Sequence, residues 1–184
     1  MRTAVIDERI INELVIALAR NPRASLQELA DTVRIGKTTL YRYSKTREEL
    51  IDKLRGRCVS AMLAATELAD LQTLPVQDAL ASLVRNHLAN KEACAFLLAY
   101  WRSPHTLHAR QTDGQWQAYE QAMENFFIRG QKAGFFKIGI TAFCLIDLFG
   151  YVVAGLAESA LAGRIASLGL EDTAVDLLLN GLRA

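Results

Sequence analysis

Apolar residues recur along the chain at the three- and four-residue spacing of amphipathic helices, and no segment alternates apolar and polar residues over strand length. Three such stripes are Ile10, Ile11, Leu14 and Leu18; Leu80, Leu83, Val84, His87 and Leu88; and Trp116, Tyr119, Met123 and Phe127. Proline and glycine mark expected helix boundaries at Asn21-Pro22, Pro75, Ser103-Pro104 and Gly134. The pattern predicts an all-α protein of about nine helices.

The expected helices differ in length, which indicates two parts. Short helices crowd the first third of the chain, and longer ones follow. We therefore expect a three-helix N-terminal head over residues 1–50 and a larger C-terminal helical bundle over residues 51–184. The boundary falls inside a helix that begins near Thr46. With 51% apolar residues and only three prolines, the composition is that of a globular protein.

Two capping boxes in the head each predict the beginning of a helix. Ser25 stands three residues before Glu28, and Thr46 stands three residues before Glu49. At this spacing, hydroxyl and carboxylate groups satisfy the free backbone amides of a first helical turn. Two short apolar faces lie between the boxes, separated by Gly36. We expect a helix-turn-helix packed on the first helix of the chain.

The second short helix, about residues 37–43, has an exterior suited to DNA. After Leu40 is assigned to the core, cationic, hydroxyl and phenol side chains remain, and no acidic residue falls between Gly36 and Arg47. Cationic side chains neutralise phosphates, and Arg, Lys and Thr can read base edges in the major groove. Double-stranded DNA is therefore the expected partner.

Charge along the chain supports this interpretation but leaves alternatives open. Residues 1–57 hold twelve Lys or Arg against eight Asp or Glu, giving +4, whereas residues 58–184 carry −3. A polyanion is expected at the N-terminal part. The alternatives are a solvated basic face, or a helical dimeric interaction protein whose basic head binds an acidic protein partner. Steep salt dependence would distinguish DNA binding from the latter.

Residues 25–51 resemble the helix-turn-helix signature of the TetR family of transcriptional regulators. The resemblance is carried mainly by Leu29-Ala30, Thr39-Leu40-Tyr41, Tyr43 and Glu49-Leu50. It implies a dimeric repressor that a small-molecule effector releases from a near-palindromic operator. The alternative with the same DNA-binding role is an activator or a global regulator. It also places Arg47 against a phosphate at the start of the next helix.

Three positions of the head depart from the family's usual pattern. Arg34 stands where the turn glycine is usual and is expected in the left-handed conformation. Gly36 stands where a capping serine is common, and Ser44 where a phenylalanine packs the head. The candidate DNA-binding residues are Ser25, Arg34, Lys37, Thr38, Thr39, Tyr41, Arg42, Tyr43, Lys45 and Arg47.

The body contains a concentration of aromatic side chains that is typical of a ligand pocket. Apolar, aromatic lining with a few polar groups suits a small apolar or aromatic effector, and His87, Arg102 and His105 could supply polar groups. Ordinary core packing is the alternative for each aromatic residue. The candidate ligand-binding residues are Phe96, Tyr100, Trp101, Trp116, Tyr119, Met123 and Phe127.

A segment from Thr141 to Arg164 is apolar on nearly all sides, which requires cover on both faces of a helix. One face can meet the body and the other a second subunit, as in the family's usual dimer; a fully internal helix is the alternative. The candidate interface residues of this homodimer are Leu145, Leu148, Phe149, Val152, Val153 and Leu156.

Other classes of protein are disfavoured. The apolar stretch at 142–157 carries Asp147 and falls short of the roughly 20 residues of a membrane span. The N-terminus does not resemble an export signal, and three widely spaced cysteines suit the reducing cytoplasm. The three histidines form no obvious catalytic or metal-binding constellation, so we expect no cofactor, no metal and no enzymatic activity.

Overall fold

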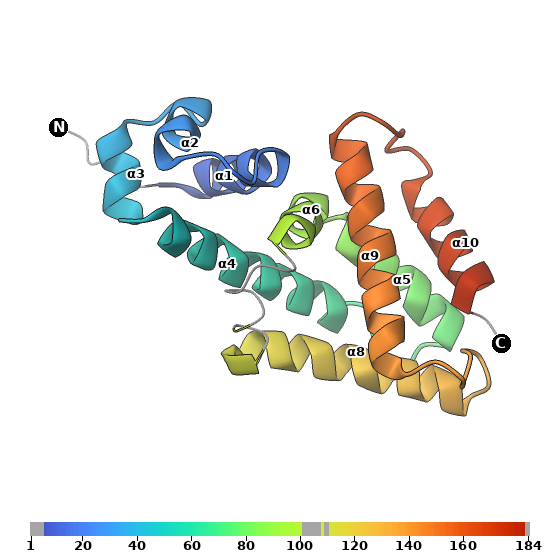
Figure 1. Ribbon diagram of the computed structural model, residues 1–184. Coiled ribbons are helices and arrows are strands. Elements are labelled where there is room, and N and C mark those ends of the chain that lie inside the picture. The colour runs from blue at the N-terminus through green and yellow to red at the C-terminus, as the bar shows by residue number, and fades with distance from the viewer. Residues whose placement is uncertain (1–5, 101–107, 109–110, 183–184) are drawn as a thin grey trace.

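The computed structural model describes residues 6–100, 108 and 111–182 of the chain. Over these residues it contains nine helices and no strand, which confirms the predicted all-α fold. The helices are α1 Glu8–Arg20, α2 Leu26–Thr32, α3 Lys37–Tyr43, α4 Arg47–Glu67, α5 Val76–Leu88, α6 Lys91–Tyr100, α8 Gly114–Lys132, α9 Ala142–Leu161 and α10 Leu170–Leu182 (Figure 1).

Helices α1, α2 and α3 form a head at one end of the molecule, and α4 leads from it into the body (Figure 1). The predicted apolar stripe of α1 is buried, and Leu14 and Leu18 are fully inaccessible. Leu29 of α2, Leu40 of α3 and Leu50 of α4 are equally buried and belong to the same apolar cluster. This shared core fixes α3 against its neighbours because apolar side chains lose contact with water only when the helices stay together.

Both predicted capping residues begin helices, but only the first box closes completely. Ser25 Oγ accepts a hydrogen bond from the Glu28 amide at 3.2 Å, and the Glu28 carboxylate accepts one from the Ser25 amide at 2.7 Å. Thr46 Oγ1 accepts from the Glu49 amide at 3.1 Å. The Glu49 carboxylate, however, accepts from the Lys45 amide at 2.8 Å, so the second box is half formed.

The three residues of the head that depart from the family pattern, Arg34, Gly36 and Ser44, fit the fold in different ways. Arg34 has a φ of 57°, which confirms the predicted left-handed conformation; for a residue with a Cβ atom this costs roughly 1–2 kcal/mol. Gly36 precedes α3 without providing a side-chain cap. Ser44 is only 1% exposed, and its hydroxyl donates to the Thr46 carbonyl at 3.0 Å, which satisfies the buried polar group.

In the body, α9 packs on α5, α6, α8 and α10. Buried phenylalanines fill the space beneath it: the Phe127 ring centroid lies 5.2 Å from that of Phe136 and 6.5 Å from that of Phe149. The predicted stripe of α5 is buried, as is that of α8 except for Tyr119, which is half-buried.

Helix α9 is longer than the apolar stretch that the sequence predicted, so the expectation that it is too short to span a membrane was wrong. The helix has 20 residues, so by length and composition alone it could cross a membrane. Within the fold, however, Leu145, Phe149 and Val153 are buried against other helices, and Asp147 interrupts the apolar surface. About a third of this apolar stretch, 33%, is buried inside the protein, and α9 packs on four other helices; its length and composition alone are weak evidence for a membrane span.

Gly130 of α8 provides a test of this packing. A Cβ atom at this position would overlap the Phe136 ring and lie 3.2 Å from Val76. We expect Gly130→Ala to lower the free energy of unfolding by about 2 kcal/mol, because the buried Phe136 ring must leave its position. Urea denaturation measures the change.

The matched control is Gly56→Ala in α4, where an added Cβ atom meets nothing within 4 Å. Because alanine is the better helix former, this variant should be more stable than the wild type by up to about 1 kcal/mol. Equal stability of the two variants would contradict the close approach of Phe136 to α8.

Candidate nucleic-acid interface and internal pocket

Helix α3 turns its single fully buried side chain, Leu40, into the head and presents a polar face to solvent. Lys37, Thr38, Tyr41 and Arg42 are exposed on that face, and no acidic residue lies in the helix. This chemistry suits phosphate and base-edge contacts. Two other candidates within α3, Thr39 and Tyr43, are half-buried, whereas the candidates outside the helix, Ser25, Arg34 and Lys45, are exposed.

Two lysines make cation–π contacts with the two tyrosines of α3. The Lys37 ammonium lies 5.5 Å from the centre of the Tyr41 ring, and the Lys53 ammonium lies 4.9 Å from the centre of the Tyr43 ring. Lys53 also donates to the Tyr43 carbonyl and pairs with Glu49 at 2.7 Å. The Lys53 hydrogen bond and the Lys45 amide lower the pKa of Glu49. The C-terminal end of α3 is thus fastened to α4 while its outer face stays open.

Arg47 occupies a different environment from the expected phosphate contact. Its Nε donates to the Ala24 carbonyl at 2.9 Å, and its Nη2 donates to the Pro22 carbonyl and lies 3.5 Å from the Tyr100 hydroxyl. The Tyr100 hydroxyl itself donates to Pro22 at 3.2 Å. Arg47 and Tyr100 therefore join the loop between α1 and α2 to the start of α4 and the end of α6, an arrangement we call the junction.

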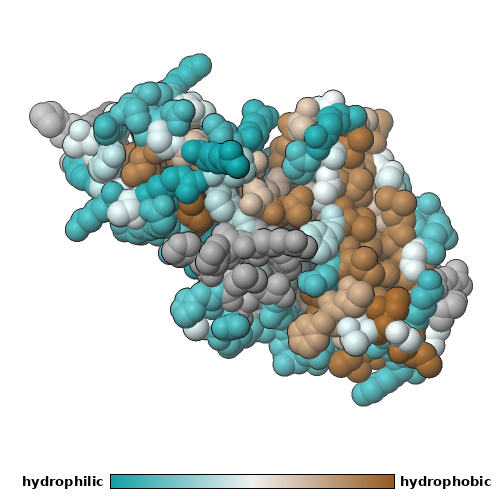
Figure 2. Space-filling view, viewed as in Figure 1, coloured by the Kyte–Doolittle hydropathy of each residue, from teal (hydrophilic) through white to brown (hydrophobic). Residues whose placement is uncertain are grey.

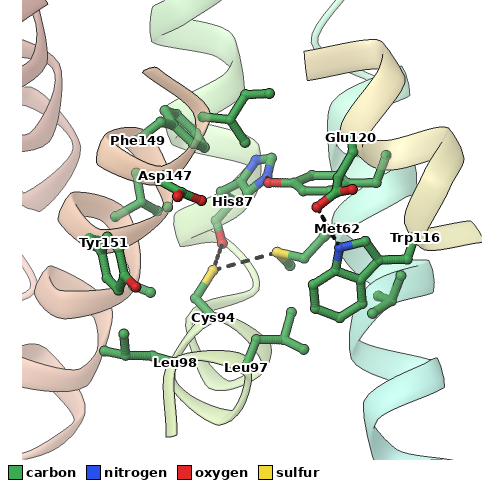
Figure 3. Close-up of a pocket in the computed structure, with 16 residues that line it drawn as sticks. Met62, His87, Cys94, Leu97, Leu98, Trp116, Glu120, Asp147, Phe149 and Tyr151 are labelled. Atoms are coloured by element: carbon green, nitrogen blue, oxygen red, sulfur yellow. Dashed lines mark hydrogen bonds between the residues drawn. The ribbon is translucent and has the colours of Figure 1, made fainter. Parts of the chain in front are cut away.

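An internal pocket lies among α4, α5, α6, α8 and α9 (Figure 3). Its cavity has a volume of about 50 Å³, and most of its lining is apolar. Of the predicted ligand-binding residues, Trp116 and Tyr119 line it. Since drug-sized ligands occupy pockets of roughly 300–1,000 Å³, a ligand must push these helices apart to enter.

Other predicted ligand-binding residues lie outside the pocket. Phe96, Met123 and Phe127 are fully buried in the apolar core and do not line the cavity, and Tyr100 lies at the junction. We assign these four side chains to packing or to the junction instead of to a ligand. Trp101 lies outside the described residues, as do Arg102 and His105.

His87 of α5 is the most deeply buried polar group of the pocket, at 2% exposure. Its Nδ1 lies 2.9 Å from the Leu83 carbonyl, and its Nε2 lies 3.4 Å from the Tyr119 hydroxyl. Because a carbonyl only accepts, Nδ1 carries the proton and Nε2 accepts from Tyr119. Burial lowers the pKa of His87 to about 4, against the opposing effect of the Leu83 hydrogen bond. The ring is therefore neutral at neutral pH.

Several residues that line the pocket were not among the predicted ligand-binding residues. Met62 of α4 and Cys94 of α6 line the cavity and contact each other through their sulfur atoms at 3.6 Å. Glu120 of α8 and Asp147 of α9 contribute carboxylates. Helical spacing alone could have found Glu120, which lies one turn after Trp116, but nothing in the sequence links Met62 to Asp147.

The outer face of α9 carries part of the predicted dimer surface. Leu145, Phe149 and Val153 are buried within the protomer, so they cannot meet a second subunit in this arrangement. Leu148 is 40% exposed, and Val152 and Leu156 are half-buried. Figure 2 shows hydrophobic side chains gathered along α9 and toward α10. An available apolar surface thus exists, formed by half of the predicted residues.

Within the described part of the chain, no group of three His, Cys, Asp or Glu side chains could hold a metal ion. All three cysteines are free; Cys58 and Cys94 are buried, and burial raises the pKa of each thiol to about 12. Both thiols are therefore protonated and poorly reactive.

Comparison with known proteins places these features in context. No protein-family model matches the chain. Over 175 residues, 95% of this chain and 93% of the relative, it is 34% identical to the HTH-type transcriptional regulator NfxB of Pseudomonas aeruginosa. This relative is a regulator, in agreement with the expectation that the chain is not an enzyme.

Two solved structures share the fold. The TetR-like regulator LfrR of Mycobacterium smegmatis, in complex with proflavine, is 22% identical with a TM-score of 0.72, and 96% of each chain is covered. The regulator PfmR of Thermus thermophilus, also of the TetR family, is 21% identical with a TM-score of 0.66, covering 96% of this chain and 97% of that one.

The neutral, buried His87 predicts a pH dependence of stability. Its pKa is about 4 in the fold and 6.5 ordinarily, so between these pH values the unfolded chain binds more protons. The free energy of unfolding should therefore fall as the pH is lowered through this window, with a slope approaching about 1.4 kcal/mol per pH unit. Above pH 6.5 the His87 contribution is fully present and constant.

Urea denaturation at a series of pH values measures this slope. His87→Gln, which cannot titrate, should show a shallower dependence than the wild type, since the other two histidines are common to both proteins. Identical slopes in the two proteins would show that His87 titrates normally in the fold.

Proposed function

Because the chain belongs to the TetR family of DNA-binding transcriptional regulators, we propose that it is a homodimeric repressor that a small-molecule effector releases from a near-palindromic operator. The observation that carries this proposal is α3, a seven-residue helix that buries Leu40 in the head and presents basic and hydroxyl groups to solvent. The protein acts in the cytoplasm, where its free cysteines stay reduced.

In this proposal, α3 enters the major groove. Lys37, Thr38 and Arg42 are exposed and chemically able to contact base edges and phosphates. Tyr41, held by the Lys37 ammonium, adds a phenol at the same surface. The remaining candidates flank the groove and contact the phosphate backbone; they are Ser25, Arg34, Thr39, Tyr43 and Lys45.

Two copies of the head are required to read a palindrome. The outer face of α9 supports twofold association because it exposes Leu148 beside Tyr151, and α10 adds Leu177, which is 52% exposed. Small residues such as Gly155 permit close approach of a second helix. A dimer formed there leaves both heads free, since α3 lies at the opposite end of the molecule (Figure 1).

The effector binds in the internal pocket and acts through α4. Val59 and Met62 of α4 line the pocket, and the same helix begins at Arg47 in the junction. A ligand that enlarges the cavity displaces α4 and changes how the head is held. The complex of LfrR with proflavine supports the binding of a small molecule by this fold, and the apolar lining of the pocket favours an apolar or aromatic effector.

The DNA-binding role predicts a change in salt dependence for single cationic side chains. Arg42→Ala and Lys37→Ala should each weaken operator binding and reduce the slope of log affinity against log salt by about 1 per lost phosphate contact. Fluorescence anisotropy with a duplex selected from random sequences provides the measurement. Lys132→Ala is the matched control, because Lys132 is an exposed lysine of α8 far along the chain from the head.

If the slope of log affinity against log salt is unchanged in both variants, α3 does not contact the DNA phosphates. If the wild-type protein selects no duplex at any salt concentration, the basic head binds an acidic protein partner instead, and the repressor proposal is abandoned.

The dimer predicts a loss of association when charge is placed on α9. We expect Leu148→Glu to be a monomer of about 20.4 kDa in light scattering, whereas the wild type has twice that mass. The control Leu68→Glu changes an apolar side chain that is 77% exposed elsewhere and should stay dimeric. A dimeric Leu148→Glu protein would place the interface on another surface.

A further inference from the structure

Among the described residues that line the internal pocket, the charged groups are both acidic. Asp147 of α9 and Glu120 of α8 approach the cavity from two sides (Figure 3). Among the described residues that line it there is no lysine or arginine. The described lining thus places carboxylates in an otherwise apolar setting, and a charged group in such surroundings selects strongly between ligands.

Asp147 is the carboxylate available to a ligand. It is half-buried, and no hydrogen bond or ion pair joins it to another described residue. Glu120, by contrast, already accepts a hydrogen bond from the Trp116 indole at 3.1 Å. Tyr151 follows Asp147 by one helical turn, also lines the pocket and is 40% exposed, so Asp147 lies near the mouth of the pocket.

The histidine among the described lining residues, His87, adds no positive charge beside this carboxylate. His87 is neutral at neutral pH because burial lowers its pKa to about 4. The aromatic lining includes Trp116 and Phe149, and aromatic rings can attract a cation placed over their faces. An anionic ligand would meet repulsion from the carboxylates and gain nothing from the neutral imidazole.

We propose that the pocket selects amphiphilic cations, with an apolar or aromatic body among the buried side chains and a protonated or quaternary nitrogen beside the Asp147 carboxylate. The inference rests on the proposed function, which makes this pocket the effector site. Near the mouth, the cation keeps part of its hydration while pairing with Asp147, so that binding does not require full desolvation of either charge.

The test compares 9-aminoacridine, a cation at neutral pH, with acridine, which is neutral at that pH and has the same ring system. Isothermal titration calorimetry measures both affinities without DNA. The wild type should prefer the cation by about tenfold or more, which corresponds to about 1.4 kcal/mol. Asp147→Asn should abolish this preference and leave acridine binding within about twofold of the wild type.

Two further variants separate charge from structure. Asp147→Glu keeps the carboxylate and should retain the cation preference, and Asp172→Asn removes an exposed carboxylate of α10 and should behave as the wild type. Equal binding of both dyes by the wild type, or an unchanged preference in Asp147→Asn, overturns the inference while the effector site stands. Binding of neither dye overturns this inference and also the assignment of the pocket as the effector site.

Discussion

The orientation of the head depends on the hydrogen bonds of one arginine. Arg47, the first residue of α4, reaches back to the carbonyls of Pro22 and Ala24 and across to the hydroxyl of Tyr100 at the end of α6. Loop carbonyls need donors, and a planar guanidinium offers several in a fixed geometry. Because α3 packs on the helices held at this junction, Arg47 also sets the direction in which the basic face of α3 points.

Much of the head could be predicted because its signals are local. The Ser25 box depends only on residues three positions apart, and both of its hydrogen bonds form. The left-handed conformation of Arg34 followed from the resemblance, which places this residue where the family usually has the turn glycine. Leu40 is buried because it is the apolar residue of a helix that is otherwise polar. In each case the decisive partner lies within a few residues in the sequence.

The body was less predictable because its partners are distant in sequence. Phe127 and Trp116 lie on the same apolar stripe of α8 but have different surroundings. Phe127 packs against Phe136 and Phe149 in the core, whereas Trp116 lines the cavity. Likewise, an arginine at the start of a helix, such as Arg47, can bind either a phosphate or a loop carbonyl. Residue type alone does not tell which of the two partners it has. The apolar circumference of α9 also gave no indication which side faces inward, so the dimer candidates included buried residues such as Leu145.

The small volume of the internal pocket bears directly on the proposed coupling between effector and operator. A ligand shifts a conformational equilibrium only if it binds one arrangement better than another. A cavity of about 50 Å³ cannot admit a drug-sized molecule, so this arrangement has low affinity for such a ligand and any ligand favours a more open one. Two of the helices that line the cavity reach the head directly. Helix α4 does so through Arg47, and α9 through its Leu161 carbonyl, which accepts a hydrogen bond from Arg20 at 3.4 Å. In the proposed function, preference for the open arrangement would reach α3 through these contacts, without any contact between ligand and head.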